Sequence, residues 1–354
     1  MAKYKISQKA LLTDSDGTRD LIAESLVHSG TFTVTNTINS LTPDYFTNYF
    51  LRNPYQGNGS GYFSGGGPPS VDTIQKYPFT TDANGVSVGT LTASRSSKAA
   101  TLSRTHGFYG GGTPGPSPTT TIEKFPFAID GSASSVGNLS VGTRNAAGNS
   151  SDTHGYSSGG FRPSSSNIID KYPFSISSGT ATDVGDLTRI VYSAGASSSP
   201  AGGFVTGGNS PSPGGNVIDK FPFASDTNAT NVGSLSPAHA GSTSNIAGYS
   251  SETHGYTSGG QPGNSNFIDK FPFATSSGAA ADVGDLTTGR GEHAGTSSFN
   301  HGYSAGGETP SGPPYNTNII DKFPFSTDAN ATDVGDLATA NQSSGTVETQ
   351  SGRT

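Results

Sequence analysis

The sequence predicts an all-β protein, a six-bladed β-propeller, with a small mixed α/β segment at the N-terminus. Three short motifs recur six times, in the same order, along the 354-residue chain. The tetrapeptide Lys-(Phe/Tyr)-Pro-Phe returns every 47 to 52 residues, and its last phenylalanines are Phe79, Phe127, Phe174, Phe223, Phe273 and Phe325. A β-rich unit of about 50 residues, repeated this regularly, is typical of the blades of a propeller.

The other two motifs flank the tetrapeptide. A Gly-aromatic run upstream ends in two glycines, the second of which are Gly66, Gly112, Gly160, Gly208, Gly260 and Gly307. Downstream stands Val-Gly-x-Leu, which ends at Leu91, Leu139, Leu187, Leu235, Leu286 and Leu337. Because glycine accepts positive φ and close backbone approach, we expect the double glycine to end a packed strand at a turn.

Each unit is interpreted as four short strands. Strand b is the Gly-aromatic run, strand c contains the tetrapeptide, strand d contains Val-Gly-x-Leu, and strand a is the Ser/Gly-rich stretch after the leucine. Alternation along strand c puts Asp321, Phe323 and Phe325 on one side and Ile320 and Lys322 on the other. Proline cannot donate to a ladder, so strand c should leave it at the proline.

The order of the strands predicts how the ring closes. The first unit begins at strand b, near Gly61, and the last unit is followed by a spare strand a within residues 338–352. Pairing residues near 338–350 with residues 59–66 would complete the first blade and remove two open sheet edges. The predicted domains are therefore an N-terminal segment, 1–58, and a propeller, 59–354.

These motifs resemble the kelch repeat. The resemblance rests on Tyr256-Thr-Ser-Gly-Gly260, Ile268-Asp-Lys-Phe271, Val283-Gly-Asp-Leu286 and Arg290, and Arg95, Arg144 and Arg189 also follow the leucine of their units. The chain has no tryptophan, and valine stands where kelch repeats have one. We expect the twelve aromatic residues of the tetrapeptides to fill that volume, at roughly 1.5–3 kcal/mol for each buried ring.

The wording Thr-His-Gly-Tyr-x-Ser-Gly-Gly, with Ile-Asp-Lys-Phe-Pro-Phe and Asp-Val-Gly-Asp-Leu, also resembles tandem-repeat virion proteins of marine bacteriophages, cyanophages among them. The resemblance covers residues 59–354. It implies a virion structural or appendage protein, such as a tail fibre or a tail or capsid decoration, and it does not specify which.

The N-terminal 58 residues do not repeat. We expect a strand within Lys3–Leu12, a short helix within Thr18–His28, a strand at 30–38 and a helix at 43–51 with Thr42 as its N-cap. The last helix would carry an aromatic stripe, Tyr45, Phe46, Tyr49 and Phe50. Two interpretations stay open: the stripe packs on the propeller as a cap, or it docks on another virion protein.

Composition excludes several classes of function. With no cysteine there is no disulfide or thiolate metal site, and a net charge of −7 disfavours nucleic-acid binding. We see no signal peptide and no stretch of about 20 apolar residues that would insert into a membrane. The expected location is the virion, after synthesis in the host cytoplasm.

No motif indicates catalysis, a metal or another cofactor. Four histidines, His106, His154, His254 and His301, recur in the turn before strand b and suit a turn-capping role better than metal binding. The adjacent Asp-Lys pairs of strand c point to opposite faces and are interpreted as solvated or cross-strand charge. Gly-x-Ser-x-Gly at Gly155 and Gly302 copies the strand b motif, and a hydrolase nucleophile would need a following helix. The sequons at Asn228 and Asn330 mean little without a secretory signal.

The sequence therefore predicts a non-enzymatic protein for display and binding. Loops rich in Ser, Thr, Asn, Gly and Tyr suit adaptable polar recognition. We expect partners to be other virion proteins, through the N-terminal segment, and a host cell-surface glycan or protein, with the chain oligomeric in the particle. The alternatives are an interaction scaffold outside the virion and a glycan-active enzyme.

Overall fold

The computed structural model divides the chain into two compact units, Met1–Arg52 and Asn53–Thr354. It describes residues 59–342 except positions 68, 211–214, 240, 242, 275–276 and 311–314, together with four short strands near the N-terminus. Among these residues the only helical element is one 3-10 turn, η1 (Pro237–His239). The protein is all-β, as predicted.

The described part of the N-terminal unit consists of two antiparallel strand pairs. β1 (Tyr4–Ile6) pairs with β4 (Leu26–His28), and β2 (Ala10–Thr13) pairs with β3 (Asp20–Ala23). The helix predicted over residues 18–28 is therefore wrong. Apolar residues of β3 stand opposite apolar residues of β2 in the ladder, and this pairing competes with the local hydrogen bonds of a helix.

Three further predictions for this unit lie outside the described residues. They are the strand at 30–38, the helix at 43–51 and the aromatic stripe Tyr45, Phe46, Tyr49 and Phe50.

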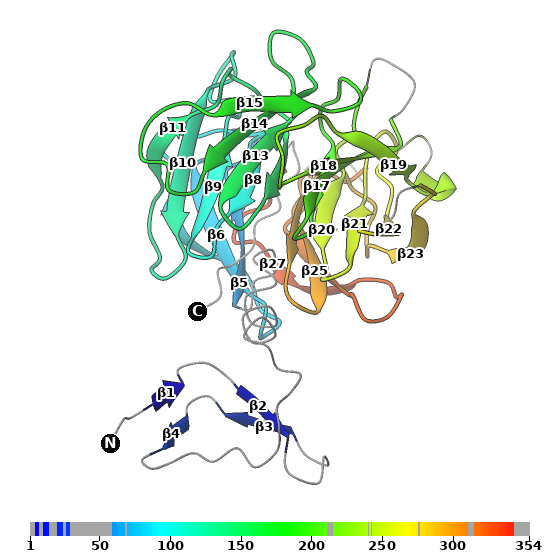
Figure 1. Cartoon of the computed structure of the whole chain (residues 1–354). Helices are drawn as coiled ribbons and strands as arrows, with labels where there is room; N and C mark the ends of the chain where they lie inside the picture. The colour runs from blue at the N-terminus through cyan, green and yellow to red at the C-terminus, as the bar shows by residue number, and fades with distance from the viewer. Residues whose placement is uncertain are drawn as a thin grey trace. The chain divides into compact units, whose positions relative to one another are not determined.

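The second unit is a six-bladed β-propeller (Figure 1). Blade 1 has three described strands, β5 (Ser60–Ser64), β6 (Thr73–Pro78) and β7 (Val86–Thr90). Blades 2 to 6 each have four antiparallel strands, here called a to d in chain order. Blade 2 contains β8 (Ala99–Leu102), β9 (His106–Gly110), β10 (Thr121–Pro126) and β11 (Ser134–Asn138).

The other four blades repeat this order. Blade 3 contains β12 (Ala147–Ser150), β13 (His154–Ser158), β14 (Ile168–Pro173) and β15 (Thr182–Asp186). Blade 4 contains β16 (Gly195–Ser198), β17 (Gly202–Thr206), β18 (Val217–Pro222) and β19 (Thr230–Ser234). Blade 5 contains β20 (Ala247–Ser250), β21 (His254–Ser258), β22 (Phe267–Pro272) and β23 (Ala281–Asp285). Blade 6 contains β24 (Ala294–Ser297), β25 (His301–Ala305), β26 (Ile319–Pro324) and β27 (Thr332–Asp336).

All six c strands end at the proline of the tetrapeptide, as predicted, because proline has no N–H to continue the ladder. Each c strand also has a register shift where it meets the Val-Gly of strand d, which marks a β-bulge. Both faces of strand c are buried, since Ile320 and Phe323 lie on opposite sides and each is 1% exposed. The blade is thus packed between two neighbours.

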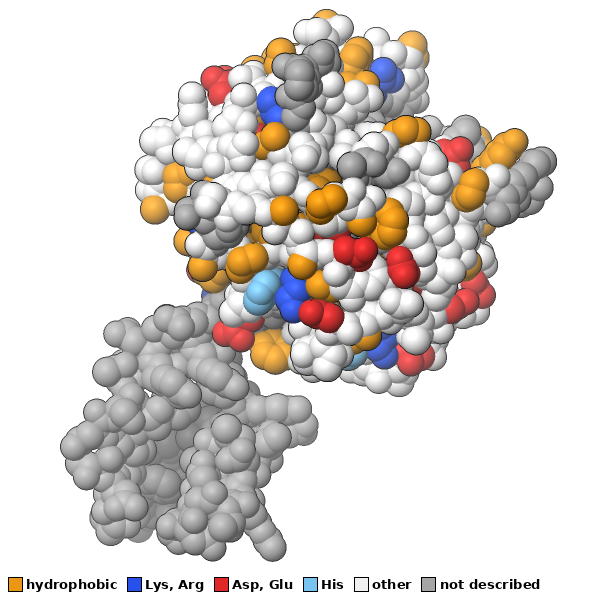
Figure 2. Space-filling view, turned by 90° about the vertical axis from the view of Figure 1, so that its right-hand side faces the viewer, with side chains coloured by type: hydrophobic (Ala, Val, Ile, Leu, Met, Phe, Trp, Pro, Cys, Tyr) orange, Lys and Arg blue, Asp and Glu red, His pale blue; other side chains and the backbone are white. Residues whose placement is uncertain are grey.

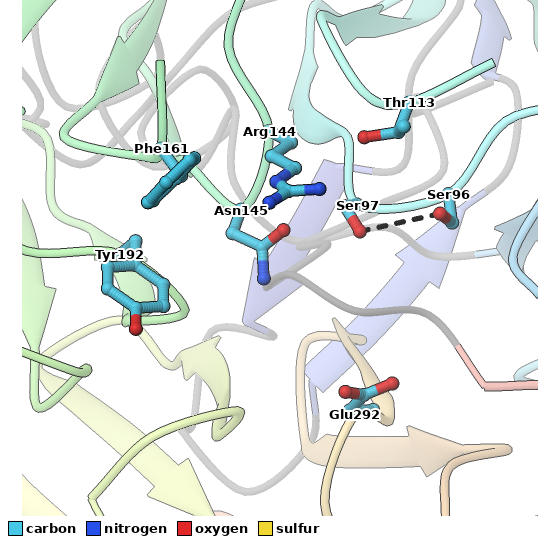
Figure 3. Close-up of a pocket in the computed structure, with 8 residues that line it drawn as sticks. All are labelled: Ser96, Ser97, Thr113, Arg144, Asn145, Phe161, Tyr192 and Glu292. Carbon is cyan, nitrogen blue, oxygen red and sulfur yellow. Dashed lines mark hydrogen bonds between the residues drawn. The ribbon is translucent and has the colours of Figure 1, made fainter. Parts of the chain in front are cut away.

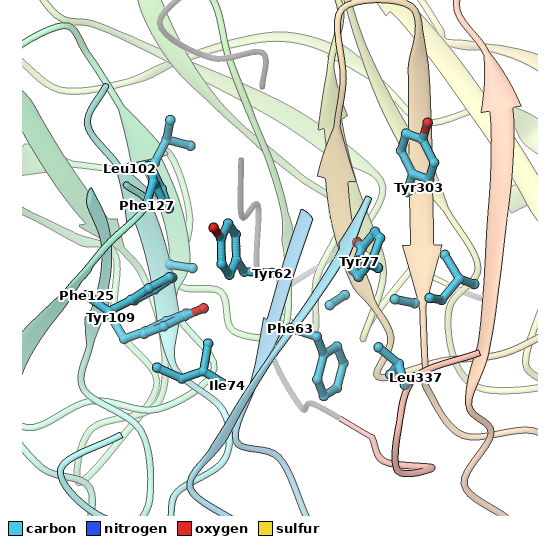
Figure 4. Close-up of a cluster of buried hydrophobic side chains, with 14 of the residues drawn as sticks. Tyr62, Phe63, Ile74, Tyr77, Leu102, Tyr109, Phe125, Phe127, Tyr303 and Leu337 are labelled. Atoms are coloured by element: carbon cyan, nitrogen blue, oxygen red, sulfur yellow. The ribbon is translucent and has the colours of Figure 1, made fainter. Parts of the chain in front are cut away.

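Aromatic stacking joins every blade to the next. The aromatic residue of strand b in one blade packs on the phenylalanine that ends the tetrapeptide of the following blade. Their ring centroids are 4.5 to 5.3 Å apart. The pairs are Tyr62–Phe127, Phe108–Phe174, Tyr156–Phe223, Phe204–Phe273, Tyr256–Phe325 and Tyr303–Phe79. The last pair joins blade 6 to blade 1, so the ring is closed. Figure 4 shows Tyr303 of blade 6 in one buried cluster with Tyr62 and Tyr77 of blade 1.

Backbone hydrogen bonds fasten the same interfaces at the rim. In the turn between strands c and d, one N–H donates to the carbonyl at the end of strand d in the preceding blade, as from Ala133 to Thr90 and from Ala229 to Asp186. The bond from Gly85 to Asp336, 2.7 Å, repeats this contact between blades 1 and 6. Six such bonds encircle the propeller.

The inner strands pack very closely. A Cβ added at Gly148 would lie 2.0 Å from the carbonyl oxygen of Ala100, and one at Gly248 would lie 1.9 Å from that of Ala196. A serine at the end of β12, β16, β20 and β24 accepts a hydrogen bond from the preceding blade, as Ser150 does from Leu102 N–H and Ser198 from Ser150 N–H. The Ser/Gly-rich composition of strand a is thus a requirement of the narrow centre.

The end of the described chain enters blade 1. The Gln342 carbonyl accepts a bond from Gly67 N–H, and Asn341 Nδ2 donates to the carbonyl of Gly65. Blades 2 to 6 each have an equivalent backbone bond, such as that from Thr113 N–H to Ser96 O. In each, the residue that accepts the bond is three positions before the first residue of strand a. This matches the predicted direction of closure, and the rest of the predicted closing strand, up to residue 350, lies outside the described residues.

The stack between Tyr303 and Phe79 can be tested by its effect on stability. Tyr303→Ala should lower the free energy of unfolding by roughly 3–5 kcal/mol, because it leaves a cavity against Phe79 at the blade 6–blade 1 interface. Urea titration measures this change. Ile129→Ala, at a side chain 68% exposed, is the control and should change stability by less than about 0.5 kcal/mol. Equal effects of the two substitutions would contradict the stacking role.

Deletion of residues 340–354 tests the closure. It removes the Asn341 and Gln342 bonds to blade 1 and the segment expected to complete its sheet. We expect a lower melting temperature by calorimetry, with blade 1 amides losing hydrogen-exchange protection before those of blade 4. An unchanged melting transition would show that blade 1 does not depend on this segment.

Candidate binding site at one mouth of the propeller

The charged residues of strand c have a structural role. Asp170, Asp219, Asp269 and Asp321 are fully buried, so the interpretation of these aspartates as solvated charge is wrong. Each pairs with a buried base: Arg162 at 3.2 Å, Arg189 at 3.6 Å, His239 at 3.1 Å and Arg290 at 2.7 Å. Blade 2 has the equivalent pair, Arg95–Glu123. In blade 1, where the acid is Gln75, the residue equivalent to Arg290 is Asn341, and the Gln75 Oε1 accepts a bond from Thr339 N–H.

Four lysines of strand c, three of which follow these aspartates and one of which follows Gln75, point to the opposite side of the strand, as the alternation predicted, and reach the rim. Lys76, Lys171, Lys270 and Lys322 pair with Asp130, Asp226, Asp328 and Asp82 of the next blade at 2.7 to 3.0 Å. The aspartates of these pairs are more than half exposed, so each pair contributes about 0–1 kcal/mol. These charges join blades.

The recurrent histidines, expected in the turn before strand b, are the first residues of the b strands and hydrogen-bond back to that turn. The N–H of His154 donates to Ser151 Oγ, and its Nδ1 hydrogen-bonds Thr153 Oγ1 at 2.8 Å. His106 and His254 make the same two contacts, and His301 N–H bonds Ser298 Oγ. Burial, helped by the nearby lysine, lowers the pKa of all four imidazoles. In residues 59–342, as far as the structure describes them, no three His, Asp or Glu side chains group as metal ligands.

The remaining motifs also belong to the scaffold. Gly155 and Gly302 lie in strands β13 and β25, each followed by a turn and another strand, which is the wrong geometry for a hydrolase nucleophile. The amide oxygens of Asn228 and Asn330 accept bonds from Asp186 N–H and Asp285 N–H of the preceding blade. The second glycines, Gly66 to Gly307, all have φ between 90° and 121°, which explains why the repeat requires glycine there.

The repeats differ most at one end of the propeller. The b–c turns vary in composition, as between Gly111-Gly-Thr-Pro-Gly-Pro-Ser-Pro and Gly259-Gly-Gln-Pro-Gly-Asn-Ser-Asn, and they have eight to thirteen residues, whereas the c–d turns have seven or eight. The b–c turns contain 12 of the 22 prolines, and the six tetrapeptides contain 6 more. Proline restricts the unfolded loop and so favours a preorganised surface. Because the strands are antiparallel, the d–a connections reach the same end.

A ring of left-handed residues surrounds the axis at this end. Ser97, Asn145, Ser193, Asn245 and Glu292, one from each of five blades, have φ between 55° and 62°. Each of the last four donates its backbone N–H to the carbonyl of the ring residue before it, as Asn145 does to Ser97 and Ser193 to Asn145. Their polar side chains are thereby fixed around the mouth of the propeller, which we call the b–c mouth.

A cavity of about 340 Å³ opens at the b–c mouth. Its walls come from four blades and include five hydrogen-bonding residues, two aromatic rings and one arginine (Figure 3): Ser96, Ser97, Thr113, Asn145, Glu292, Phe161, Tyr192 and Arg144. Small-molecule sites combine concave shape with a few converging polar groups, and this cavity lies at the lower end of their size range.

Arg144 lies over the ring of Phe161, with the guanidinium carbon 4.8 Å from the ring centroid. Tyr192 meets Phe161 edge to face at 5.8 Å. The backbones of Arg144 and Phe161 exchange two hydrogen bonds, which hold both side chains at the mouth. In this position Arg144 differs from Arg95, Arg189 and Arg290, which the sequence grouped with it and which form buried ion pairs.

Acidic groups occupy the opposite side of the mouth. Burial and then the like charge of Glu308 raise the pKa of Glu292 to about 7. Glu292 Oε1 accepts a bond from Asn245 Nδ2 at 3.4 Å, and Glu308 Oε2 accepts one from Gln261 Nε2 at 3.0 Å. Figure 3 shows Glu292 facing the Arg144 side across the open centre of the cavity.

The sequence did not predict Phe161, Tyr192, Asn145 or Glu292 as a site. A signal was present, because these residues stand where the repeats disagree. Repeated motifs draw attention to positions that recur in every blade. They do not indicate a site that occurs only once in the chain. The face drawn in Figure 2 is mainly uncharged, and its basic and acidic side chains lie in small neighbouring groups.

Comparison with protein-family models and with curated proteins finds no match to this chain. The propeller fold is established by its structure, and the resemblance to kelch repeats and to marine bacteriophage proteins stays a prediction from the sequence. Across the described residues, the structure contains no helix with the length and apolar character needed to span a bilayer.

A buried lysine beside the mouth provides a test of the electrostatics. Lys98 is fully buried, and its Nζ donates to the carbonyls of Ser64, at 2.9 Å, and Arg95, at 3.2 Å. Burial and then the charge of Arg95 lower the pKa of Lys98 to about 7, although Glu123 opposes this shift. The folded protein therefore favours the neutral amine above neutral pH.

We predict that stability rises between pH 7 and about 9.5. In this interval Lys98 is protonated in the unfolded chain and neutral in the folded chain, so the unfolded state binds more protons. Raising the pH therefore destabilises the unfolded state relative to the folded state. Urea titrations at several pH values measure the slope. Lys98→Met should flatten it, whereas Lys76→Met, at the rim, should leave it unchanged. A slope that persists in Lys98→Met would assign it to other groups.

Proposed function

We propose that this protein is a non-enzymatic bacteriophage virion protein that displays its propeller for binding at the host surface. The fold supports an interaction role, because a closed propeller holds many loops on a rigid frame. The observation that carries the proposal is the convergence of the variable b–c turns around one polar and aromatic cavity. The resemblance of the repeat motifs to those of marine bacteriophage proteins supports the virion location.

The opposite mouth differs in ways that favour the b–c mouth. Its c–d turns are uniformly short, with seven or eight residues, and are occupied by bonds between blades, such as those of Ala133 and Asn228. Short turns that are tied to the neighbouring blade suit a structural task, and the longer b–c turns, which vary in length, suit recognition. In this proposal the N-terminal segment, 1–58, attaches the protein to other virion proteins.

Mass spectrometry of purified particles tests the location. We expect peptides from residues 59–342 at a stoichiometry similar to that of other structural proteins. Recovery only from the soluble fraction of infected cells would contradict the virion assignment and favour an interaction scaffold outside the particle.

A cell-binding assay with the purified chain tests the use of the b–c mouth. Phe161→Ser with Tyr192→Ser should reduce binding to host cells by about tenfold or more, as for removal of central aromatic contacts. Phe299→Ser is the matched control, because this aromatic side chain is 48% exposed in an a–b turn at the opposite end. Equal binding by both variants would place recognition elsewhere.

A further inference from the structure

We propose that the cavity at the b–c mouth binds a carboxylate-bearing sugar, with Arg144 holding the carboxylate and the rings of Phe161 and Tyr192 contacting the sugar ring. This inference rests on the proposed function and names the class of ligand that the mouth recognises. It requires a cation available for an anion, an aromatic surface and hydroxyl-binding groups in one cavity.

The available cation is Arg144. Of the six arginines that the structure describes, Arg95, Arg104, Arg162, Arg189 and Arg290 each form an ion pair with an aspartate or glutamate. Arg144 is the sixth; it forms no ion pair with a described residue and lines the cavity. A guanidinium binds a carboxylate through two parallel hydrogen bonds, and such charge-assisted bonds are about twice as strong as neutral ones.

The aromatic surface lies beside this cation. Phe161 and Tyr192 meet at an interplanar angle of 78° and form a corner of the cavity. The C–H faces of a pyranose ring are apolar and pack on aromatic rings, while its hydroxyls point outward. Arg144 already stacks on Phe161, which restrains the guanidinium before a ligand arrives and lowers the entropic cost of binding.

Hydroxyl-binding groups complete the cavity. Ser96, Ser97, Thr113 and Asn145 offer both donors and acceptors, and Glu292 offers an acceptor on the opposite side. The pKa of about 7 leaves Glu292 partly protonated near neutral pH, but the pair Glu292 and Glu308 together still carries negative charge. This charge disfavours a carboxylate there, so the ligand has one favoured orientation, with its carboxylate toward Arg144.

The shape favours a sugar over an acidic peptide. A peptide adds along a sheet edge or lies in an extended groove, and this cavity is compact, about 340 Å³, and built across the mouth from four blades. A volume near the lower end of the range for small ligands suits one or two sugar residues at the end of a surface polysaccharide.

Calorimetric titration of the full chain tests the ligand class. The probes are the methyl glycosides of glucuronic acid and of N-acetylneuraminic acid, and methyl glucoside, which has glucuronic acid's ring with CH₂OH in place of the carboxylate. We expect at least one acidic glycoside to bind about tenfold or more tightly than methyl glucoside. Equal affinities, or no binding by any probe, would overturn the proposal.

Two arginine variants locate the carboxylate. Arg144→Gln should abolish the preference for the acidic glycoside and leave weak binding of both kinds. Arg104→Gln removes a surface charge in an a–b turn at the opposite end and should keep the preference. Preference retained in Arg144→Gln would overturn the assignment of this residue.

An acidic tripeptide is the competing probe. Tighter binding of the tripeptide than of every glycoside would show that the ligand class is a peptide and would reject the sugar. The cell-binding assay with Phe161→Ser and Tyr192→Ser separates this failure from failure of the proposed function. Cell binding that is lost in that variant, without affinity for acidic glycosides, would keep the mouth as the recognition surface and change only its ligand.

Discussion

The structure depends on aromatic stacking between consecutive blades. A single four-stranded blade of this chain has two faces to bury and too little apolar surface to fold alone. The six stacks, from Tyr62–Phe127 to Tyr303–Phe79, supply that surface at every interface, each worth about 0.5–1.5 kcal/mol beyond the burial of its rings. Because the sixth stack joins the last blade to the first, no blade is left with an unpaired face.

The stacks explain how so polar a chain can fold. Only 30% of its residues are hydrophobic, and 50 are glycine. The glycines let inner strands approach until a Cβ would collide with a carbonyl, as at Gly148, and buried acid–base pairs such as Arg290–Asp321 occupy part of the interior. A buried pair is costly to break, at roughly 3–5 kcal/mol, so the pairs also favour one arrangement of neighbouring blades. At the closing blade both charges are replaced by the amides Gln75 and Asn341, which avoids an unpaired ion.

A rigid frame leaves the loops at one end free to differ. The turns that fasten blades together, such as the one containing Asn228, have seven or eight residues in every copy, whereas the b–c turns have between eight and thirteen. The ring of left-handed residues gives the b–c mouth a fixed backbone, on which Arg144, Phe161 and Tyr192 are placed once each. Symmetry in the scaffold and asymmetry at the mouth are what a specific binding surface on a propeller requires.

The sequence by itself determined the number of blades, the four strands of each blade and the ends of the c strands, because these follow from spacing, alternation and the chemistry of glycine and proline. Local pattern misassigned residues 20–28, where cross-strand pairing prevailed over helical periodicity. Only the tertiary structure decided that Asp321 is buried, that Arg144 differs from Arg290, and that Phe161, Tyr192 and Glu292 share one cavity. The reason is physical. Whether a side chain is buried, and which side chains meet in a cavity, depends on residues of other blades, and the sequence of a single repeat does not specify those residues.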